Sequence, residues 1–216
     1  MAFDFKKEDK EFYLPKSVPS IVEIPQMNYI AVSGKGDPNE PDGEYQRALG
    51  LLYPVAYALK MSYKGERKID GFFEYVVPPL EGLWWTEGAG SLDLTDKSAF
   101  SWIAMIRLPD FVRREDFEWA LNEAGRKKKA DFSAVEFLTV EEGLCVQIMH
   151  VGTYDDEARS IVSIDKFLEV NGYAKDLSGS RRHHEIYLSD PRKTPAEKLK
   201  TVIRIPVVKA RRPDAG

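Results

Sequence analysis

The residues best suited to chemistry lie in the segment His183–Ser189, near the C-terminal end of the chain. This segment places a carboxylate at the centre of what otherwise resembles a buried β-strand. Because successive side chains of a strand point to opposite faces, Glu185 and Tyr187 share one face while His184 projects from the other. A carboxylate beside a phenol suits either general-base catalysis or the binding of a cationic group. We therefore expect Glu185 and Tyr187 to form the centre of a site.

Other residue types offer weaker candidates for chemistry. Cys145 lies in an apolar segment without a basic neighbour, so we interpret it as a buried structural thiol rather than a nucleophile. His183 and His184 are adjacent and would project from opposite faces, which predicts no metal site. The sequence contains no phosphate-binding loop, dinucleotide fingerprint or nucleophile elbow, and we expect no cofactor.

The elements that must position these residues follow an α+β pattern. Apolar residues recur at intervals of three and four over the helices predicted at 44–60, 113–129 and 155–170. Pro54 should kink the first helix or mark a break between two helices, and Gly172 should cap the third. A short helix is expected over 193–200, with Thr194 as its N-cap. Strands are predicted over 20–33 (broken near Pro25), 72–77, 101–108, 135–140, 144–151, 183–189 and 201–207, with 135–151 forming a hairpin.

The same order of elements occurs twice along the chain. Each half contains a strand, a glycine-containing loop, a helix, a strand with a central glutamate and a further extended segment, over 29–75 and 146–187. This order implies an internal duplication in which Glu74 and Glu185 occupy matching places, although the two glutamates need not have the same role. We expect one domain over 1–216 with modules at about 18–110 and 111–208, related by a pseudo-twofold axis around a central cleft.

Composition excludes several classes of protein. The chain has 216 residues and a net charge of −4, which argues against a general nucleic-acid binder. The basic run at 126–129 fits the end of a helix, where cations are favoured, better than a phosphate site. A single cysteine allows no intrachain disulfide, and no apolar run reaches the length of a signal peptide or a membrane span. We expect a cytoplasmic protein with no membrane partner.

Four motifs of the chain resemble those of the stand-alone GyrI-like small-molecule-binding proteins. They are the residues at 28–32 (NYIAV), 43–45 (GEY), 79–85 (PLEGLWW) and 184–191 (HEIYLSDP). The resemblance covers nearly the whole chain. It implies two strand–helix–strand–strand modules around a ligand cleft, a fold shared with the SbmC gyrase-inhibitor superfamily and with effector domains of multidrug-sensing activators. It also implies that Glu185 lies at the floor of that cleft.

One branch of this family is of special interest, because Trp84, Trp85 and Glu185 resemble the corresponding part of the cyclopropanoid cyclopropyl hydrolases. These proteins open the strained ring of DNA-alkylating natural products. The regulators of the superfamily carry a DNA-binding helical domain in front of this fold, whereas only a short segment precedes the first strand here. We therefore expect an aromatic small molecule as the partner and no direct contact with nucleic acid.

The lining of the cleft is expected to be aromatic. Extended backbone would point Trp84 and Trp85 to opposite sides, so one should line the cleft and the other should lie in the core. Each further candidate has a structural alternative: Glu185 would instead pair with Arg181 or Arg182 if it lay on an edge strand, and the others would belong to the core. The predicted ligand-binding residues are Trp84, Trp85, Tyr75, Trp102, Tyr154, Met149 and His184.

Two functions fit these residues. As a hydrolase, Glu185 would activate water to attack the least hindered cyclopropane carbon, while Tyr187 would hold that water or donate to the developing phenolate. As a sensing or sequestering module, the carboxylate would pair with cationic or donor groups of planar ligands that stack on the aromatic rings. The second function would involve gyrase or a separate transcription factor. An arginine packed dry against Glu185 would argue against hydrolysis.

Overall fold

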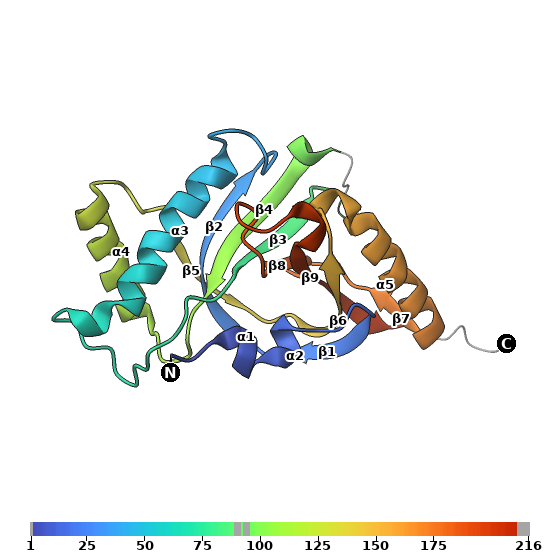
Figure 1. Cartoon of the computed structure of the whole chain (residues 1–216), viewed down its shortest axis with the longest axis horizontal. Helices are drawn as coiled ribbons and strands as arrows, with labels where there is room; N and C mark the ends of the chain where they lie inside the picture. The colour runs from blue at the N-terminus through green and yellow to red at the C-terminus, as the bar shows by residue number, and fades with distance from the viewer. Residues whose placement is uncertain (1, 89–91, 93–95, 211–216) are drawn as a thin grey trace.

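The computed structural model describes residues 2–88, 92 and 96–210. It is an α+β fold built on one antiparallel nine-stranded sheet, whose strand order is β1-β6-β9-β8-β3-β4-β2-β5, with β7 paired to β9 (Figure 1). The strands are β1 (Ser20–Ile24), β2 (Met27–Lys35), β3 (Leu80–Thr86), β4 (Phe100–Arg107), β5 (Glu136–Val140), β6 (Gly143–Val151), β7 (Tyr173–Lys175), β8 (His183–Tyr187) and β9 (Lys200–Lys209). The α-helices are α1 (Phe5–Glu8), α2 (Lys10–Tyr13), α3 (Glu44–Lys60), α4 (Arg114–Lys128) and α5 (Glu157–Asn171).

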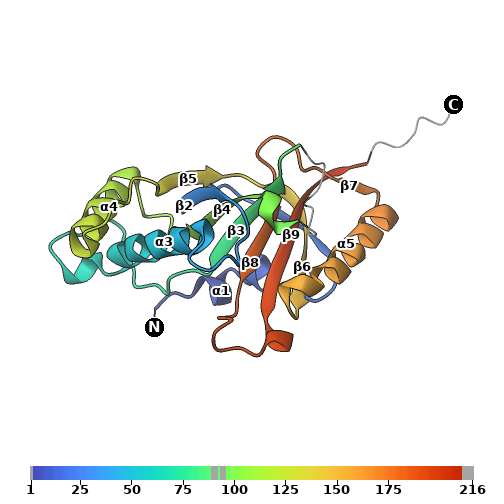
Figure 2. The ribbon, with the colours of Figure 1, turned by 90° about the horizontal axis from the view of Figure 1, so that it is seen from above.

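The sheet is symmetrical about its central pair, β3 and β8. The first half runs β2-α3-β3-β4 along the chain and pairs as β3-β4-β2. The second half runs β6-α5-β7-β8-β9 and pairs as β8-β9-β6, with the short β7 as an addition on β9 that the first half lacks among its described residues. Helices α3 and α4 lie over the first half and α5 over the second (Figures 1 and 2). The α+β fold is therefore as predicted, but the strand that follows α3 in the first half is β3 and not the segment predicted over 72–77. We propose that the module boundary falls near residue 110.

The outer strands are exchanged between the two halves. β1 is separated from β2 by two residues, yet it pairs with β6 in the other half. Likewise β5 precedes β6 directly but pairs with β2. The predicted hairpin over 135–151 is therefore wrong: both strands exist, but Gly143, whose φ of 61° suits a glycine, begins a strand that leads into the other half. Short-range pattern cannot distinguish this exchange from a hairpin.

The strand predicted over 72–77 is also absent. Apart from an isolated bridge between Tyr75 and Phe3, this segment is not part of the sheet. Pro78 and Pro79 lack the N–H groups that a central strand needs, so the ladder begins only at Leu80. The aromatic side chains of the segment pack instead on the N-terminal segment and on Phe111. Glu74 is consequently exposed and does not mirror Glu185.

Three smaller expectations have mixed outcomes. Helix α3 continues through Pro54, whereas Gly172 ends α5 in the left-handed conformation, as predicted. The helix expected over 193–200 is reduced to a single 3-10 turn at Ala196–Lys198. Within the described residues, no helix is long and apolar enough to cross a bilayer.

The two faces of the sheet are covered differently. On one face, α3 packs on β2 and β4 around the fully buried Trp102, and α4 packs beside α3. On the other face, the N-terminal segment supplies Phe5 and Tyr13, which pack against residues of β6, β8 and β9. Because side chains alternate along each strand, β8 presents Glu185 to the first face and His184 to the second.

A buried ionic network lies on the second face. Nδ1 of the fully buried His184 is 3.0 Å from Oε1 of Glu142, and its Nε2 is 3.0 Å from Oε2 of Glu81. Arg204 contacts the second oxygen of Glu142 at 2.9 Å, and the Tyr13 hydroxyl donates to Glu81 at 3.1 Å. Positive and negative groups thus alternate, and removing one of them would leave an unpaired buried charge at a cost of about 3–5 kcal/mol.

This network shifts two pKa values in opposite directions. Burial alone would raise the pKa of Glu142, but the charges of His184 and Arg204 outweigh it and hold that pKa at about 2. Burial alone would lower the pKa of His184, but Glu142 and then Glu81 outweigh it and raise that pKa to about 9. Both groups are therefore charged at neutral pH in the folded protein.

We predict that the network's contribution to the free energy of unfolding is largest between about pH 4.5 and 6.5, the ordinary pKa values of glutamate and histidine. Below that range it falls as Glu142 takes up a proton on the way to its folded pKa of about 2. Above it, the contribution is lost as the pH rises through the folded pKa of His184, about 9. Urea denaturation across pH tests this, and His184→Gln should flatten the alkaline decline. A wild-type stability without change between pH 6.5 and 9 would contradict the prediction.

Candidate functional site

The candidate site lies on the first face, along the seam where β3 and β8 pair. Gly82 is opposite Glu185 in this ladder, Leu80 is opposite Tyr187, and Trp84 is opposite His183. The side chains project toward the first residues of α5 and toward α3, whose Tyr45 ring lies 5.3 Å from the Trp84 ring. The site therefore combines a strand from each half with a helix from each half.

Glu185 is held by hydrogen bonds on both of its oxygens. The Tyr187 hydroxyl donates to Oε2 at 2.9 Å, and His183 Nε2 lies 3.0 Å from Oε1. Trp84 Nε1 in turn donates to the Tyr187 oxygen at 3.0 Å, so indole, phenol and carboxylate form a chain of hydrogen bonds. This chain fixes the orientation of a carboxylate that is almost completely buried.

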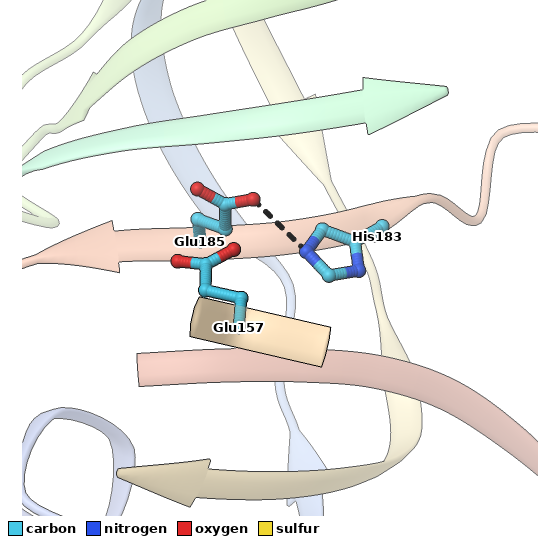
Figure 3. A group of neighbouring side chains, drawn as sticks. All are labelled: Glu157, His183 and Glu185. Atoms are coloured by element: carbon cyan, nitrogen blue, oxygen red, sulfur yellow. Dashed lines mark hydrogen bonds and ion pairs between the residues drawn. The ribbon is translucent and has the colours of Figure 1, made fainter. Parts of the chain in front are cut away.

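A second carboxylate faces Glu185 from the opposite side. It belongs to Glu157, the first residue of α5, whose side chain reaches toward Glu185 and His183 (Figure 3). Burial, followed by the negative charge of Glu185, raises the pKa of Glu157 well above its usual value. Two close carboxylates favour retention of a proton by one of them, so Glu157 suits the role of proton donor.

Aromatic rings enclose the pair of carboxylates. Tyr154 meets the Tyr187 ring edge-on at 5.8 Å, and burial followed by the charge of Glu185 raises the pKa of Tyr154 to about 12. Behind them, Tyr45 lies edge-on to Trp102 at 5.0 Å. Trp102 itself is fully buried beneath Tyr45, so it supports the wall of the site from the core.

Three predicted ligand-binding residues lie on the other face of the sheet. His184 belongs to the ionic network there, as alternation along β8 requires. Met149 is opposite Val202 on β9, and both pack in the cluster that contains Tyr75. Placing Tyr75, Met149 and His184 in the cleft is therefore wrong, because the sheet separates them from Glu185.

The two tryptophans differ in their surroundings. Trp84 is buried under Tyr45, whereas Trp85 is partly exposed and carries the guanidinium of Arg182 at 4.9 Å from its ring centroid. A cavity of about 100 Å³ at this end of the seam is lined by both tryptophans, Arg182 and His183, among others. Trp84 is thus the residue in contact with Tyr187, and Trp85 lies at the edge.

The arginine partners considered for Glu185 are engaged elsewhere. Arg181 forms an ion pair with Asp176 at 2.6 Å, and Arg182 stacks on Trp85. Within the described residues, the basic side chain in contact with Glu185 is that of His183. Cys145 is fully buried, and burial raises the pKa of its thiol to about 12, so it lacks the reactivity of a nucleophile.

Sequence reasoning missed Glu157, His183 and Tyr45 as members of the site. An acidic residue at a helix start has an ordinary explanation in the helix dipole, which concealed Glu157. Tyr45 followed the apolar stripe of its helix and was assigned to the core. For His183 a signal was present, because residues 183 and 185 of one strand share a face.

A helix-covered seam with buried carboxylates and aromatic walls defines a small-molecule-binding α+β protein. The chain belongs to the GyrI-like small molecule binding domain family, whose model matches residues 17–208. This match confirms the predicted fold and the resemblance of the chain to the GyrI-like family.

Three solved structures from Listeria innocua are similar along almost the whole chain. An uncharacterized conserved protein is 49% identical with a TM-score of 0.89, and covers 95% of this chain and 100% of its own. A hydrolase is 45% identical with a TM-score of 0.86 at the same coverage. A hydrolase encoded by lin2189 is 48% identical, with a TM-score of 0.86, covering 96% and 100% of the two chains. Comparison with curated proteins gives no match.

We predict that Gly82→Ala disrupts the site, because a Cβ at this position would lie 2.5 Å from Trp84 Nε1 and 3.2 Å from the Tyr187 hydroxyl. Overpacking on a central strand should lower the free energy of unfolding by about 1–3 kcal/mol and alter the tryptophan fluorescence. Gly50→Ala is the matched control, since its Cβ would meet nothing within 4 Å, and it should stabilise α3 by about 0.5–1 kcal/mol. Equal behaviour of the two variants would contradict the prediction.

Proposed function

We propose that this protein binds planar aromatic small molecules at the β3–β8 seam and hydrolyses cyclopropane-bearing DNA-alkylating compounds, a role in detoxification. One observation carries the proposal: Glu185 is oriented by Tyr187 and His183 while a second buried carboxyl, Glu157, faces it. A fixed base beside a proton-retaining acid is what the addition of water across a strained bond requires.

The reaction divides between these groups. Glu185 takes a proton from water as the water oxygen bonds to the least hindered carbon of the cyclopropane. The ring bond to that carbon breaks, and its electron pair passes into the conjugated ring, which becomes an aromatic phenolate. Glu157 supplies the proton that the phenolate oxygen takes up, while Tyr187 keeps the Glu185 carboxylate in place. The substrate gains one water overall, and acid–base catalysis of this kind contributes about 10²–10⁴-fold.

The relatives support hydrolysis at a coarser level. Two of the similar Listeria innocua proteins are described as hydrolases at 45% and 48% identity. These descriptions name no substrate, so the cyclopropane substrate is proposed from the resemblance of Trp84, Trp85 and Glu185 to the cyclopropanoid cyclopropyl hydrolases. The aromatic rings of Trp84, Tyr154 and Tyr187 suit a planar substrate, because offset and edge-on ring contacts add to the burial of apolar area.

A second candidate is binding without turnover, in a sensing or sequestering module. The family description refers to small-molecule binding alone, which favours this candidate. Glu185 has no arginine partner among the described residues, so a cationic group of a ligand would not have to displace one. The two candidates share the site and differ in whether water reaches Glu185 beside the ligand.

We predict that the wild-type protein adds one water to a duocarmycin-type cyclopropane compound, followed by chromatography and mass spectrometry. Glu185→Gln should lower turnover by about 10²–10⁴-fold while ligand still quenches tryptophan fluorescence, because the amide keeps the shape but cannot accept the proton. Glu74→Gln changes an exposed glutamate and serves as the control.

The outcomes separate the candidates. Equal turnover in Glu185→Gln would remove the general-base role. Unchanged compound in the presence of the wild-type protein, accompanied by fluorescence quenching, would establish a binding module instead.

A further inference from the structure

We propose that Glu157, His183 and Glu185 form a binding site for a divalent first-row transition-metal ion. Each residue offers one ligand atom, and these atoms all lie within 4.8 Å of one another. The three residues, in this order, are 2%, 4% and 7% exposed. They come from two elements that approach each other, the start of α5 and the strand β8 (Figure 3).

The spacing of these atoms fits a metal ion. Bonds of about 2.0–2.2 Å from zinc to nitrogen or oxygen, in tetrahedral arrangement, place neighbouring ligand atoms about 3.3–3.6 Å apart. His183 Nε2 and Glu185 Oε1 are already 3.0 Å apart. Glu157 approaches both from the opposite side, and a small movement of its carboxyl would complete the coordination of three protein ligands (Figure 3).

An independent observation also supports a ligand site here. Oε1 of Glu157 is buried and has no hydrogen-bond partner within the part of the chain that the structure describes. Buried polar atoms nearly always have a hydrogen-bond partner, so this oxygen supports a ligand that binds to Glu157. The nearby cation Lys97 is bound to Asp155 at 2.7 Å.

The surroundings support the ligand positions. The Tyr187 hydroxyl holds Oε2 of Glu185 and so leaves Oε1 directed toward His183. Hydrogen bonds of this kind orient carboxylate ligands in metal sites. His183 also lines the cavity of about 100 Å³, which gives an ion a route to the imidazole.

One imidazole with two carboxylates is a donor set suited to Mn²⁺, Fe²⁺, Co²⁺ or Zn²⁺ rather than to Ca²⁺ or Mg²⁺, which prefer oxygen alone. A bound ion would occupy Oε1 of Glu185, the carboxylate assigned above as the base. We therefore expect the ion to compete with hydrolysis. The site itself does not depend on the proposed function, because binding is measured without substrate.

Titration of chelator-treated protein with Co²⁺ and Zn²⁺, followed by calorimetry and by the visible absorption of Co²⁺, tests the site. We expect one equivalent to bind, with ligand-field bands in the Co²⁺ spectrum. His183→Gln and Glu157→Gln should each weaken binding by at least about tenfold, because a ligand is removed. Asp155→Asn is the matched control: it removes a nearby exposed carboxylate outside the triad and should change affinity less than threefold.

Two results would overturn the inference: no uptake at millimolar metal, or equal affinity in the wild-type protein, His183→Gln and Glu157→Gln. If either variant fails to fold, NMR of the Co²⁺-loaded wild-type protein tests the site. Paramagnetic shifts must then appear on one imidazole ring, that of His183. Absence of such shifts would refute the site. Metal binding by a protein that leaves cyclopropane compounds unchanged would instead refute only the proposed hydrolysis.

Discussion

The antiparallel pairing of β3 with β8 is the constraint on which the rest of the structure depends. It joins the two halves, and its register sets Gly82 opposite Glu185 and Trp84 opposite His183. Since a strand shows its side chains alternately to each face, this register also fixes which residues can meet the helices. A slip by one residue would move Glu185 to the face of the ionic network and bring His184 under α5. Because Gly82 has no side chain, it leaves the space in which the Trp84 and Tyr187 side chains meet.

The buried charged groups on the two faces of this seam are arranged differently. On the second face, acids and bases alternate at about 3 Å, so every charge is compensated. On the first face, the acids outnumber the bases, with Glu157 and Glu185 sharing a single histidine among the described residues. The first arrangement compensates its charges within the fold, whereas the second places two buried carboxylates beside one histidine, which is typical of functional sites. Strand β8 contributes to both groups of charges, with His184 on the second face and Glu185 on the first.

Much of the fold was predictable, and the reasons for the exceptions are physical. Helices α3, α4 and α5 follow apolar spacing, which is local, and the alternation along β8 placed Glu185 beside Tyr187. Pairing partners are set by distant segments, so the exchange of β1 and β5 carried no local signal. The segment 72–77 has strand composition but lies before two prolines, and the central strand starts after them. Tyr75 and Met149 were misplaced for the related reason that composition does not specify a face. Glu157 entered the site through tertiary contact alone.

The exchanged outer strands have a consequence for how the chain holds together. Because β1 completes the sheet of the second half and β5 that of the first, cutting the chain near residue 110 would leave each fragment carrying a strand that belongs to the other. Neither half can cover its own edge, and an uncovered edge invites pairing with another molecule. Each module thus supplies the outermost strand of the other, so unfolding one half removes a strand from the sheet of the other half.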